Sequence, residues 1–412
     1  MFSLHETTQR RVCRVLFVVC CVLPTLATVG WIAHFYRPGR LGDLQRTLRA
    51  QLHVDATVDG VASPLPGVTT LNNLRLADLK SKDLLGRFGV VRCQWQNSRL
   101  VLHADLLEIE VAQLSQAATA LATWLSSEAL VPIDVQVDRV VFLGGPFDSA
   151  TWQNLRVSSE KNGSQSISLK IEVEPTAEKL PVQLLVEHQS GPTGPSIHVT
   201  LDTLESTLPA WLLADFVPGG VHRSRAATFT GKTQMKWTAA ELQGTLQGRF
   251  AEMELSEWLG SHTPHCLQGI AALELQNLVW KDRRIQVAAG HLHATRGSAN
   301  PSLVNAASKL LECARTPACL RELARDSADI VRFDQLDFAF RLDGSGLSIT
   351  GQGMPGCLLA YQDEQLLQQP PSKLPMTRLV RLLYLPVAGW LPDTQEAHQM
   401  ASELPLPSAR RQ

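Results

Sequence analysis

Beyond residue 50, apolar and polar residues alternate along the chain with a period of two. Apolar residues hold every odd position of 167–173, and apolar residues or glycines hold every even position of 242–250 and 336–342. Strict alternation places all the apolar side chains on one face of a strand. Antiparallel sheets are built this way when one face is dry and the other meets water. Shorter runs of the same kind occupy residues 54–58, 133–137, 182–186, 197–201 and 285–289.

The alternation leaves open two interpretations of the dry face. It can form an open apolar groove, or it can pack against itself and the helices as an ordinary core. The residues that would line a groove are Ile167, Leu169, Ile171, Leu242, Leu246, Phe250, Leu336, Phe338 and Phe340.

Turns and a few helices separate the strand blocks. Residues 160–163, 190–192 and 343–346 carry turn chemistry, and the last of these lies between two alternating runs, as in a hairpin. A helical hairpin is expected at 302–330, broken at Thr316-Pro317. Other short helices are expected at 41–52, 112–127, 204–216, 255–260 and 376–385. The fold class is therefore mainly β with a few helices (α+β), in which a curved, mostly antiparallel sheet follows the N-terminal segment.

The N-terminal segment predicts a transmembrane helix. Residues 15–33 carry no charge, and a helix of about 20 residues spans a bilayer core of roughly 30 Å. The apolar stretch is long for a signal peptide, and no small-x-small cleavage site follows it. Arginines flank it on both sides, so charge alone does not set the orientation. The expected organisation is a short cytoplasmic tail (1–14), an anchor (15–35), an exported β-rich domain (36–372) and a proline-rich tail (373–412).

Charge and cysteine content narrow the function further. The net charge of −1 and pI of about 6.9 offer no field that would attract nucleic acid, so no such partner is expected. The eight cysteines include no CxxC pair. Cys313 and Cys319 flank the predicted helix break. The sequence leaves open whether they form a disulfide or remain free thiols.

Several patterns that carry chemistry elsewhere are incomplete in this chain. Residues 230–233 (TGKT) look like the end of a phosphate-binding loop, but strand alternation surrounds them. His262, His265 and Cys266 lie close together, without the further ligands that a zinc site needs. The motifs of serine hydrolases, zinc proteases and dinucleotide-binding enzymes are absent. The sequence therefore predicts no enzyme activity, no cofactor and no metal.

Other polar and aromatic candidates favour structural roles. Asp55, Asp59, Asp134 and Asp138 fall on outward strand positions, where they are expected to solvate the sheet rather than act as a catalytic pair. His291 and His293 share one face of a strand. Three tryptophans in Leu-rich segments would either touch a membrane surface or close the end of a sheet; they are Trp211, Trp258 and Trp390.

A short motif occurs three times. Leu71-Asn-Asn-Leu-Arg-Leu76 recurs as Trp152-Gln-Asn-Leu-Arg-Val157 and as Leu275-Gln-Asn-Leu-Val-Trp280. Repetition of this kind suggests strand-turn-strand units stacked along one sheet.

The opening of the chain resembles the AsmA family. A single anchor and a basic helix are followed by Val54-Asp-Ala-Thr-Val-Asp-Gly60 and by the first copy of the repeated motif, and the strands around 244–293 and 333–351 are similar in style. The resemblance implies a groove-shaped sheet on the periplasmic side of the inner membrane. It also implies a non-enzymatic role in envelope lipid handling or homeostasis, with phospholipid as ligand and an envelope protein as partner. The alternative is a structural scaffold or assembly factor without a ligand, docking through the proline-rich tail.

Overall fold

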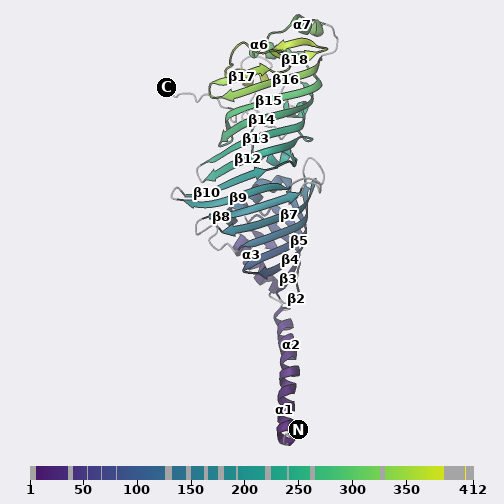
Figure 1. The fold of residues 1–412 in the computed structure, drawn as a ribbon, viewed down its shortest axis with the longest axis vertical. Coiled ribbons are helices and arrows are strands. Elements are labelled where there is room, and N and C mark those ends of the chain that lie inside the picture. The colour runs from purple at the N-terminus through teal and green to yellow at the C-terminus, as the bar shows by residue number, and fades with distance from the viewer. Residues whose placement is uncertain are drawn as a thin grey trace.

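The computed structural model shows a long, narrow molecule in which a helical stalk leads into one large twisted sheet (Figure 1). The structure describes residues 6–35, 40–52, 54–65, 67–79, 81–125, 132–144, 150–161, 166–174, 181–191, 194–218, 224–238, 241–259, 265–324, 330–384 and 404. The predicted proline-rich stretch beyond residue 384 therefore falls almost wholly outside the described residues.

The stalk is one helical rod formed by α1 (Glu6–Phe17), a π-helical turn η1 (Val18–Val22) and α2 (Leu23–Phe35). Its part Arg11–Gly30 is long and apolar enough to cross a membrane and is buried nowhere against the rest of the chain. The π turn ends two residues before Pro24, which has no N–H to continue the helical ladder. The Thr25 hydroxyl donates to the carbonyl of Cys21 at 2.6 Å. The predicted uncharged stretch 15–33 lies within this helical rod.

The described strands form a single 19-stranded sheet, mostly of strands that pair with their neighbours in sequence. The prediction of a mainly β chain with a curved sheet is confirmed. The strands are β1 (Asp55–Thr57), β2 (Gly60–Leu65), β3 (Val68–Ala77), β4 (Leu84–Gln96), β5 (Arg99–Glu110), β6 (Ile133–Leu143), β7 (Ala150–Lys161), β8 (Ser166–Glu174), β9 (Val182–Gly191), β10 (Gly194–Asp202), β11 (Leu208–Pro209), β12 (Thr228–Thr238), β13 (Leu242–Glu254), β14 (Leu267–Lys281), β15 (Arg284–Ala299), β16 (Val331–Asp343), β17 (Gly346–Gly351), β18 (Cys357–Tyr361) and β19 (Glu364–Gln368).

Among these strands, β5 and β6 form the one parallel pair, and the rest are antiparallel. A parallel pair needs a crossover, which α4 (Leu114–Leu125) supplies after a short 3-10 turn, η2 (Val111–Gln113). We call β1–β10 the anchor-proximal half of the sheet and β12–β19 the anchor-distal half. The 3-10 turn η3 (Ala210–Leu213) lies in the connection between the two halves.

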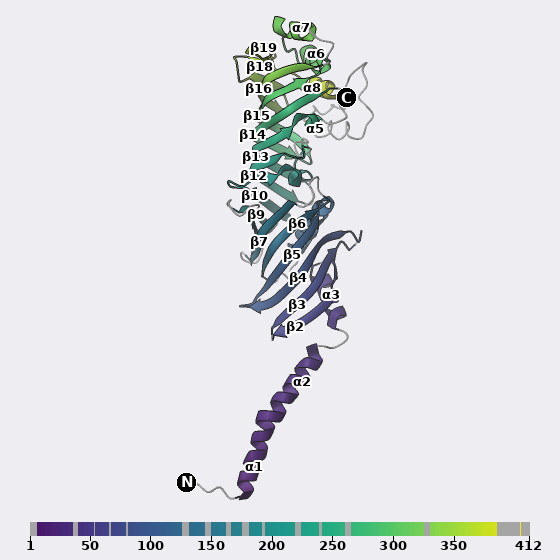
Figure 2. The same ribbon diagram turned by 90° about the vertical axis from the view of Figure 1, so that its right-hand side faces the viewer.

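The remaining helices lie on one side of the sheet, as Figure 2 shows for α3, α5, α6 and α8. Two of them begin with the same signal, a capping residue followed by proline. The Asn300 side chain accepts from the backbone N–H of Leu303 at 3.0 Å, and the Thr316 hydroxyl accepts from that of Cys319 at 3.3 Å. The predicted break at Thr316-Pro317 is therefore the start of the second helix. These helices are α3 (Arg40–Leu52), α5 (Leu255–Leu259), α6 (Pro301–Leu310), α7 (Pro317–Ala324) and α8 (Met376–Tyr384).

The repeated motif lies inside single strands, β3, β7 and β14, and not at turns between strands. Asn73 and Asn154 have φ of 55° and 51°, in the left-handed region that Asn tolerates. In the third copy the pairing register shifts between Leu275 and Asn277. The expected strand-turn-strand unit is thus wrong, because each copy is an irregularity within a strand.

Irregularities of this kind occur in two groups of strands, β3–β7 and β14–β15, and we call their positions the crease. There, apolar side chains of one strand that face the core are three residues apart and not two. At Asn73 and Asn154 the intervening residue is in the left-handed region, which reverses the side to which the next side chains point. The crease explains why strict alternation does not run through whole strands. The pairs on the crease are Leu71 and Leu74, Phe88 and Val91, Ala104 and Leu107, Val137 and Val140, Leu275 and Leu278, and Ile285 and Ala288.

Candidate functional site: the apolar inner face of the sheet

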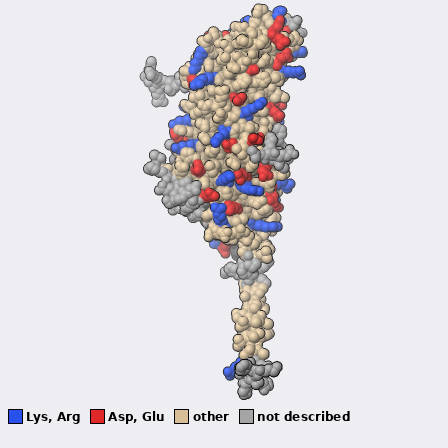
Figure 3. Space-filling model, in the orientation of Figure 1, with Lys and Arg blue, Asp and Glu red and all other residues tan. Residues whose placement is uncertain are grey.

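The sheet has an apolar inner face, on which the helices lie, and a polar outer face. In β9, Val182, Val186 and His188 are buried on the inner face, while Glu187 points to the other side. On the face seen in Figure 3, Lys and Arg alternate with Asp and Glu over the whole sheet, and no region of one sign stands out. The inner face is therefore the surface with a distinctive chemistry.

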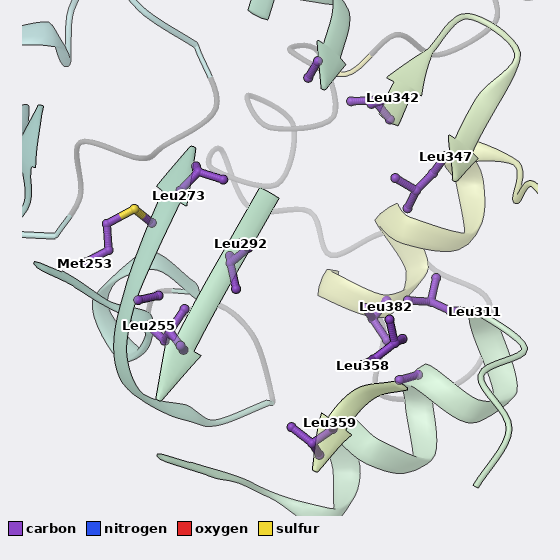
Figure 4. Close-up of a cluster of buried hydrophobic side chains, with 14 of the residues drawn as sticks. Met253, Leu255, Leu273, Leu292, Leu311, Leu342, Leu347, Leu358, Leu359 and Leu382 are labelled. Atoms are coloured by element: carbon purple, nitrogen blue, oxygen red, sulfur yellow. The ribbon is translucent and has the colours of Figure 1, made fainter. Parts of the chain in front are cut away.

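The inner face of the anchor-distal half is filled. Phe229, Leu246, Phe250 and Phe333 are each 1 % exposed or less, and they belong to a core cluster that includes side chains of α6, α7 and α8. Figure 4 shows leucines from strands and helices of this cluster pointing toward one another. This part of the dry face is an ordinary protein core.

Several glycines of the distal strands lie under aromatic side chains of neighbouring strands. Gly244, Gly290 and Gly297 lie opposite Trp280, Phe340 and Phe333 on neighbouring strands. A Cβ atom at Gly244 would come within 2.1 Å of the Trp280 ring, so the ring occupies the space that a side chain would need. Aromatic rings placed over glycines fill the sheet surface and leave no trough there.

In the anchor-proximal half, strands β3–β6 carry a second buried cluster that includes Leu71, Val137 and Phe142, whereas the inner face of β8–β10 is less completely covered. Its cluster on β8–β10 contains Leu125, Leu169 and Val186 as buried residues, surrounded by eight side chains that are only partly buried. The helical cover described here is α4, with Leu121 and Trp124 next to the cluster. Apolar surface that is neither fully buried nor fully exposed is what a groove for an apolar ligand presents.

The predicted lining residues divide between these two regions. Leu169, Leu246 and Phe250 are buried at 1 % exposure. The others are partly buried: Ile167 and Ile171 pack against the proximal cluster, Leu336, Phe338 and Phe340 pack against the distal core, and Leu242 lies at the start of β13. Ile167, Leu169 and Ile171 lie together on β8. The other six predicted positions lie on β13 and β16 of the anchor-distal half.

Four buried polar atoms on this side of the molecule lack a hydrogen-bond partner among the described groups. They are Nε2 of His188, Oγ1 of Thr233, Nε1 of Trp211 and Nε1 of Trp280. His188 is 6 % exposed and is paired across the sheet with Ile167 and Ile197. His188 continues the series of inner positions 182, 184 and 186 and could have been found from this spacing. The predicted run ended at Val186 because only apolar residues were counted.

The tryptophans predicted at the sheet ends are internal where they are described. The Trp211 ring lies 5.7 Å from that of Phe142 in a T-shaped contact, and Phe142 contacts Trp152 in the same way at 4.7 Å. Trp258 is partly buried against the distal core. Trp390 lies outside the described residues. In η3, Ala210 and Leu213 pack with the distal core, whereas Trp211 and Leu212 pack with the proximal cluster of β3–β6. The turn η3 therefore lies between the two halves of the inner face.

The polar candidates are engaged in local interactions. Asp55 pairs with Lys82 at 2.6 Å, which lowers the pKa of Asp55, and Asp134 pairs with Arg99 at 3.1 Å. Asp59 lies 3.5 Å from Arg75, and Asp138 lies 3.1 Å from His103.

His291 and His293 form the densest polar cluster on the outer face, on either side of Asp337. His291 Nε2 contacts one oxygen of Asp337, and His293 Nδ1 lies 3.2 Å from the other. Burial disfavours the charged form of Asp337, but hydrogen bonds from His291, Gln335 and His293 outweigh it, so the pKa of Asp337 is lowered. Among the described residues, no three His, Cys, Asp or Glu side chains converge in a way that could hold a metal ion.

The histidine and cysteine candidates near the distal core differ in their exposure to solvent. His265 Nδ1 lies 3.0 Å from the Ser302 hydroxyl, and burial lowers the pKa of His265. Cys266 is exposed, and His262 is outside the described residues. Cys313 and Cys319 are buried and unbonded here; burial raises the pKa of Cys313 to about 12 and also raises that of Cys319. A bond between them stays a prediction for an oxidising compartment.

The outer face carries a hollow of about 500 Å³ across β9–β15. Its side chains are mixed in charge and hydrogen-bonding character and include Glu187, His198, Lys236, Gln243 and Lys281. Lys281 is already paired with Glu241.

No protein-family model, no curated protein and no solved structure matches the chain. The geometry itself therefore carries the functional argument.

Proposed function

We propose that this protein is a single-pass, membrane-anchored lipid-handling protein that shelters acyl chains on the inner face of its anchor-proximal half. The observation that carries the proposal is the partly buried apolar surface on β8–β10, next to the unpartnered Nε2 of His188. Burial of acyl chains contributes about 0.8 kcal/mol per CH₂, so a chain lying along this face would be held firmly without specific contacts. His188 supplies a polar contact for an ester or headgroup oxygen.

The proposal includes the cellular setting that the resemblance to the AsmA family implies. The anchor would lie in the inner membrane and the sheet on the periplasmic side, in envelope lipid handling or homeostasis and without enzymatic activity. What supports this setting is the candidate span Arg11–Gly30, followed directly by a large unclosed sheet with one apolar face.

Mass spectrometry of lipid that co-purifies with the detergent-solubilised chain tests the proposal. Val199 lies on the inner face of β10 beside the proximal cluster, and Thr200 is its neighbour on the outer face. Val199→Asp should reduce the bound phospholipid several-fold, because a carboxylate in the groove disfavours acyl chains. Thr200→Asp is the matched control and should leave the phospholipid unchanged. Equal phospholipid in both variants and in the parent chain, with melting temperatures preserved, would refute a groove at this place.

The scaffold alternative has one supporting observation: the chain enters its proline-rich tail at the closed distal end. Leu374, Met376 and Leu382 are buried in the distal core, so the packed domain extends at least to α8. A truncation after Tyr384 therefore removes the tail and leaves these residues in place, whereas a truncation at Lys373 would damage the core. Loss of a co-purifying protein on truncation after Tyr384, with lipid binding unchanged, would favour the scaffold.

A further inference from the structure

Two neighbouring hairpins of the anchor-proximal half end in exposed large apolar side chains. Leu65, the last residue of β2, is 63 % exposed, and Trp95, near the end of β4, is 60 % exposed. Leu65 pairs with Val68, and Val68 pairs with Gln94, so the two residues lie at the same ends of strands β2 and β4. With strands about 4.8 Å apart, they are separated by roughly 10 Å. We call Leu65 and Trp95 the hairpin rim.

The rest of these hairpin ends suits an interfacial environment. Residues 60–68 and 93–100 contain no acidic residue. Arg99 is the charged residue at the second tip, and it is neutralised by Asp134 at 3.1 Å. The turn at Asn97 and Ser98 is tight, because both have positive φ and Gln96 pairs directly with Arg99. Uncharged tips carry a low desolvation cost on contact with lipid, and tryptophan prefers the membrane–water interface.

The anchor places this rim near the bilayer. The helix α2 ends at Phe35, two residues beyond the uncharged stretch 15–33, so the end of the helix lies at the membrane surface. The next helix begins at Arg40, so five Cα steps limit the gap to roughly 17 Å. In Figure 2, β2 and β3 are the strands nearest to α2, and β2 comes down to about the level at which α2 ends.

We infer that the hairpin rim rests on the lipid surface and inserts Leu65 and Trp95 into the headgroup region of the leaflet from which the anchor emerges. Isolated apolar residues on a protein surface need no explanation, but these two share one edge, lie beside uncharged turns and are tethered to the bilayer. The contact fixes the orientation of the sheet relative to the bilayer. The inference rests on the proposed insertion of the anchor, but it does not require that the inner face binds lipid.

Site-specific photocrosslinking tests the inference in the full chain. p-Benzoyl-phenylalanine is placed at Leu65, at Trp95, at Val19 within the span and at Ile270 in β14. Ile270 is the matched control, because it is 61 % exposed but lies in the anchor-distal half. Each protein is reconstituted in vesicles of phosphatidylcholine and phosphatidylglycerol and irradiated, and lipid adducts are quantified by mass spectrometry.

The expected result is adducts at Leu65 and Trp95 several-fold above those at Ile270 and comparable with those at Val19. Adducts at Val19, with Leu65 and Trp95 no higher than Ile270, would overturn the rim contact and leave the anchor intact. Absence of adducts at Val19 would overturn the anchor and the rim contact together. The lipid content of the Val199→Asp variant reports on the groove separately, so failure of the groove is distinguishable from failure of the rim.

Discussion

The two halves of the sheet are built by the same meander and differ in what covers their inner faces. In the anchor-distal half, α5, α6 and α8 and the pairs of aromatic residues with glycine fill the space over the strands. In the anchor-proximal half, β8–β10 carry a small buried cluster bordered by partly buried side chains. The same apolar alternation has therefore produced a closed core in the anchor-distal half and a partly covered face on β8–β10.

The edges of the sheet show the same difference. At the distal end, residues 314–316 cover the last strand: Thr316 donates its N–H to the carbonyl of Leu366 at 3.2 Å, and Gln368 donates to that of Ala314 at 2.9 Å. Among the described strands, β2 at the proximal end pairs with β3 alone. Natural sheets cover exposed edges to prevent unwanted pairing. The comparison teaches that the distal end terminates the fold, while the proximal end, next to the anchor, is the end left available.

Truncation of matched apolar residues gives the largest expected difference between the halves. Leu246→Ala in the distal core should lower the free energy of unfolding by about 3–5 kcal/mol, whereas Leu184→Ala on the proximal face should cost roughly 1–2 kcal/mol, because Leu184 is only partly buried. Denaturant unfolding followed by circular dichroism measures both. Equal costs would mean that the proximal face is a filled core as well.

Added volume is the converse test. An alanine Cβ at Gly297 would lie 2.1 Å from the carbonyl oxygen of Gln268 and 2.3 Å from the Phe333 ring, so Gly297→Ala should cost about 1–3 kcal/mol. The matched variant in the proximal half is Gly60→Ala, whose Cβ meets Asn72 at an ordinary 3.5 Å. We expect its melting temperature to stay near that of the parent chain. A tolerated alanine at Gly297 would show that the distal strands can separate.

The crease offers a smaller effect that separates the first two copies of the repeat from the third. Asn154→Val places a β-branched residue in a left-handed conformation and should cost about 1–2 kcal/mol. It also removes the hydrogen bond from Asn154 to Glu174 at 2.6 Å. Asn277→Val is the control, since Asn277 is exposed and is not among the described residues with positive φ.

A glycine variant separates the two contributions at this position. Asn154→Gly permits the backbone conformation but cannot make the hydrogen bond, so its cost reports on the side chain alone. If Asn154→Val and Asn277→Val shift the melting temperature equally, the crease does not depend on the left-handed residue.

How far the sequence predicts this structure depends on the range of the interactions involved. The strand at 336–342 and its turn at 343–346 follow from alternation and local turn chemistry, and the structure pairs Asp343 directly with Gly346. The crease could not be predicted from alternation, because a strand pattern assumes that every residue is extended. Asn73 and Asn154 are not extended. Which part of the dry face is filled depends on where α6 and α8 pack, which is a long-range outcome that no local pattern contains.

The candidate site was predictable to a similar extent. Period two placed Ile167, Leu169 and Ile171 on one strand face, but it could not distinguish the buried Leu169 from its partly buried neighbours. His188 was missed because a single polar residue ends an apolar run when the run is read by composition. The hairpin rim was missed for a related reason: whether Trp95 is covered depends on the position of the strand end in the fold.

The smallest effect concerns the junction between β16 and the chain leading into α8. The Lys373 ammonium lies 2.8 Å from Asp343, and this contact and the Ser345 hydroxyl hold the pKa of Asp343 well below its ordinary value of about 3.9. Because the folded pKa is the lower one, the stabilisation is fully present above the unfolded pKa and is lost as the pH falls through the folded value. Asp343→Asn should therefore lower the melting temperature slightly at pH 6, and the difference from the parent chain should shrink below pH 4. The Asp59→Asn variant, at a surface pair with Arg75 in the proximal half, is the control. If the Asp343→Asn difference persists unchanged at pH 2–3, the contribution of Asp343 is not ionic, and Leu374 and the core beneath it hold this junction without help from the ion pair.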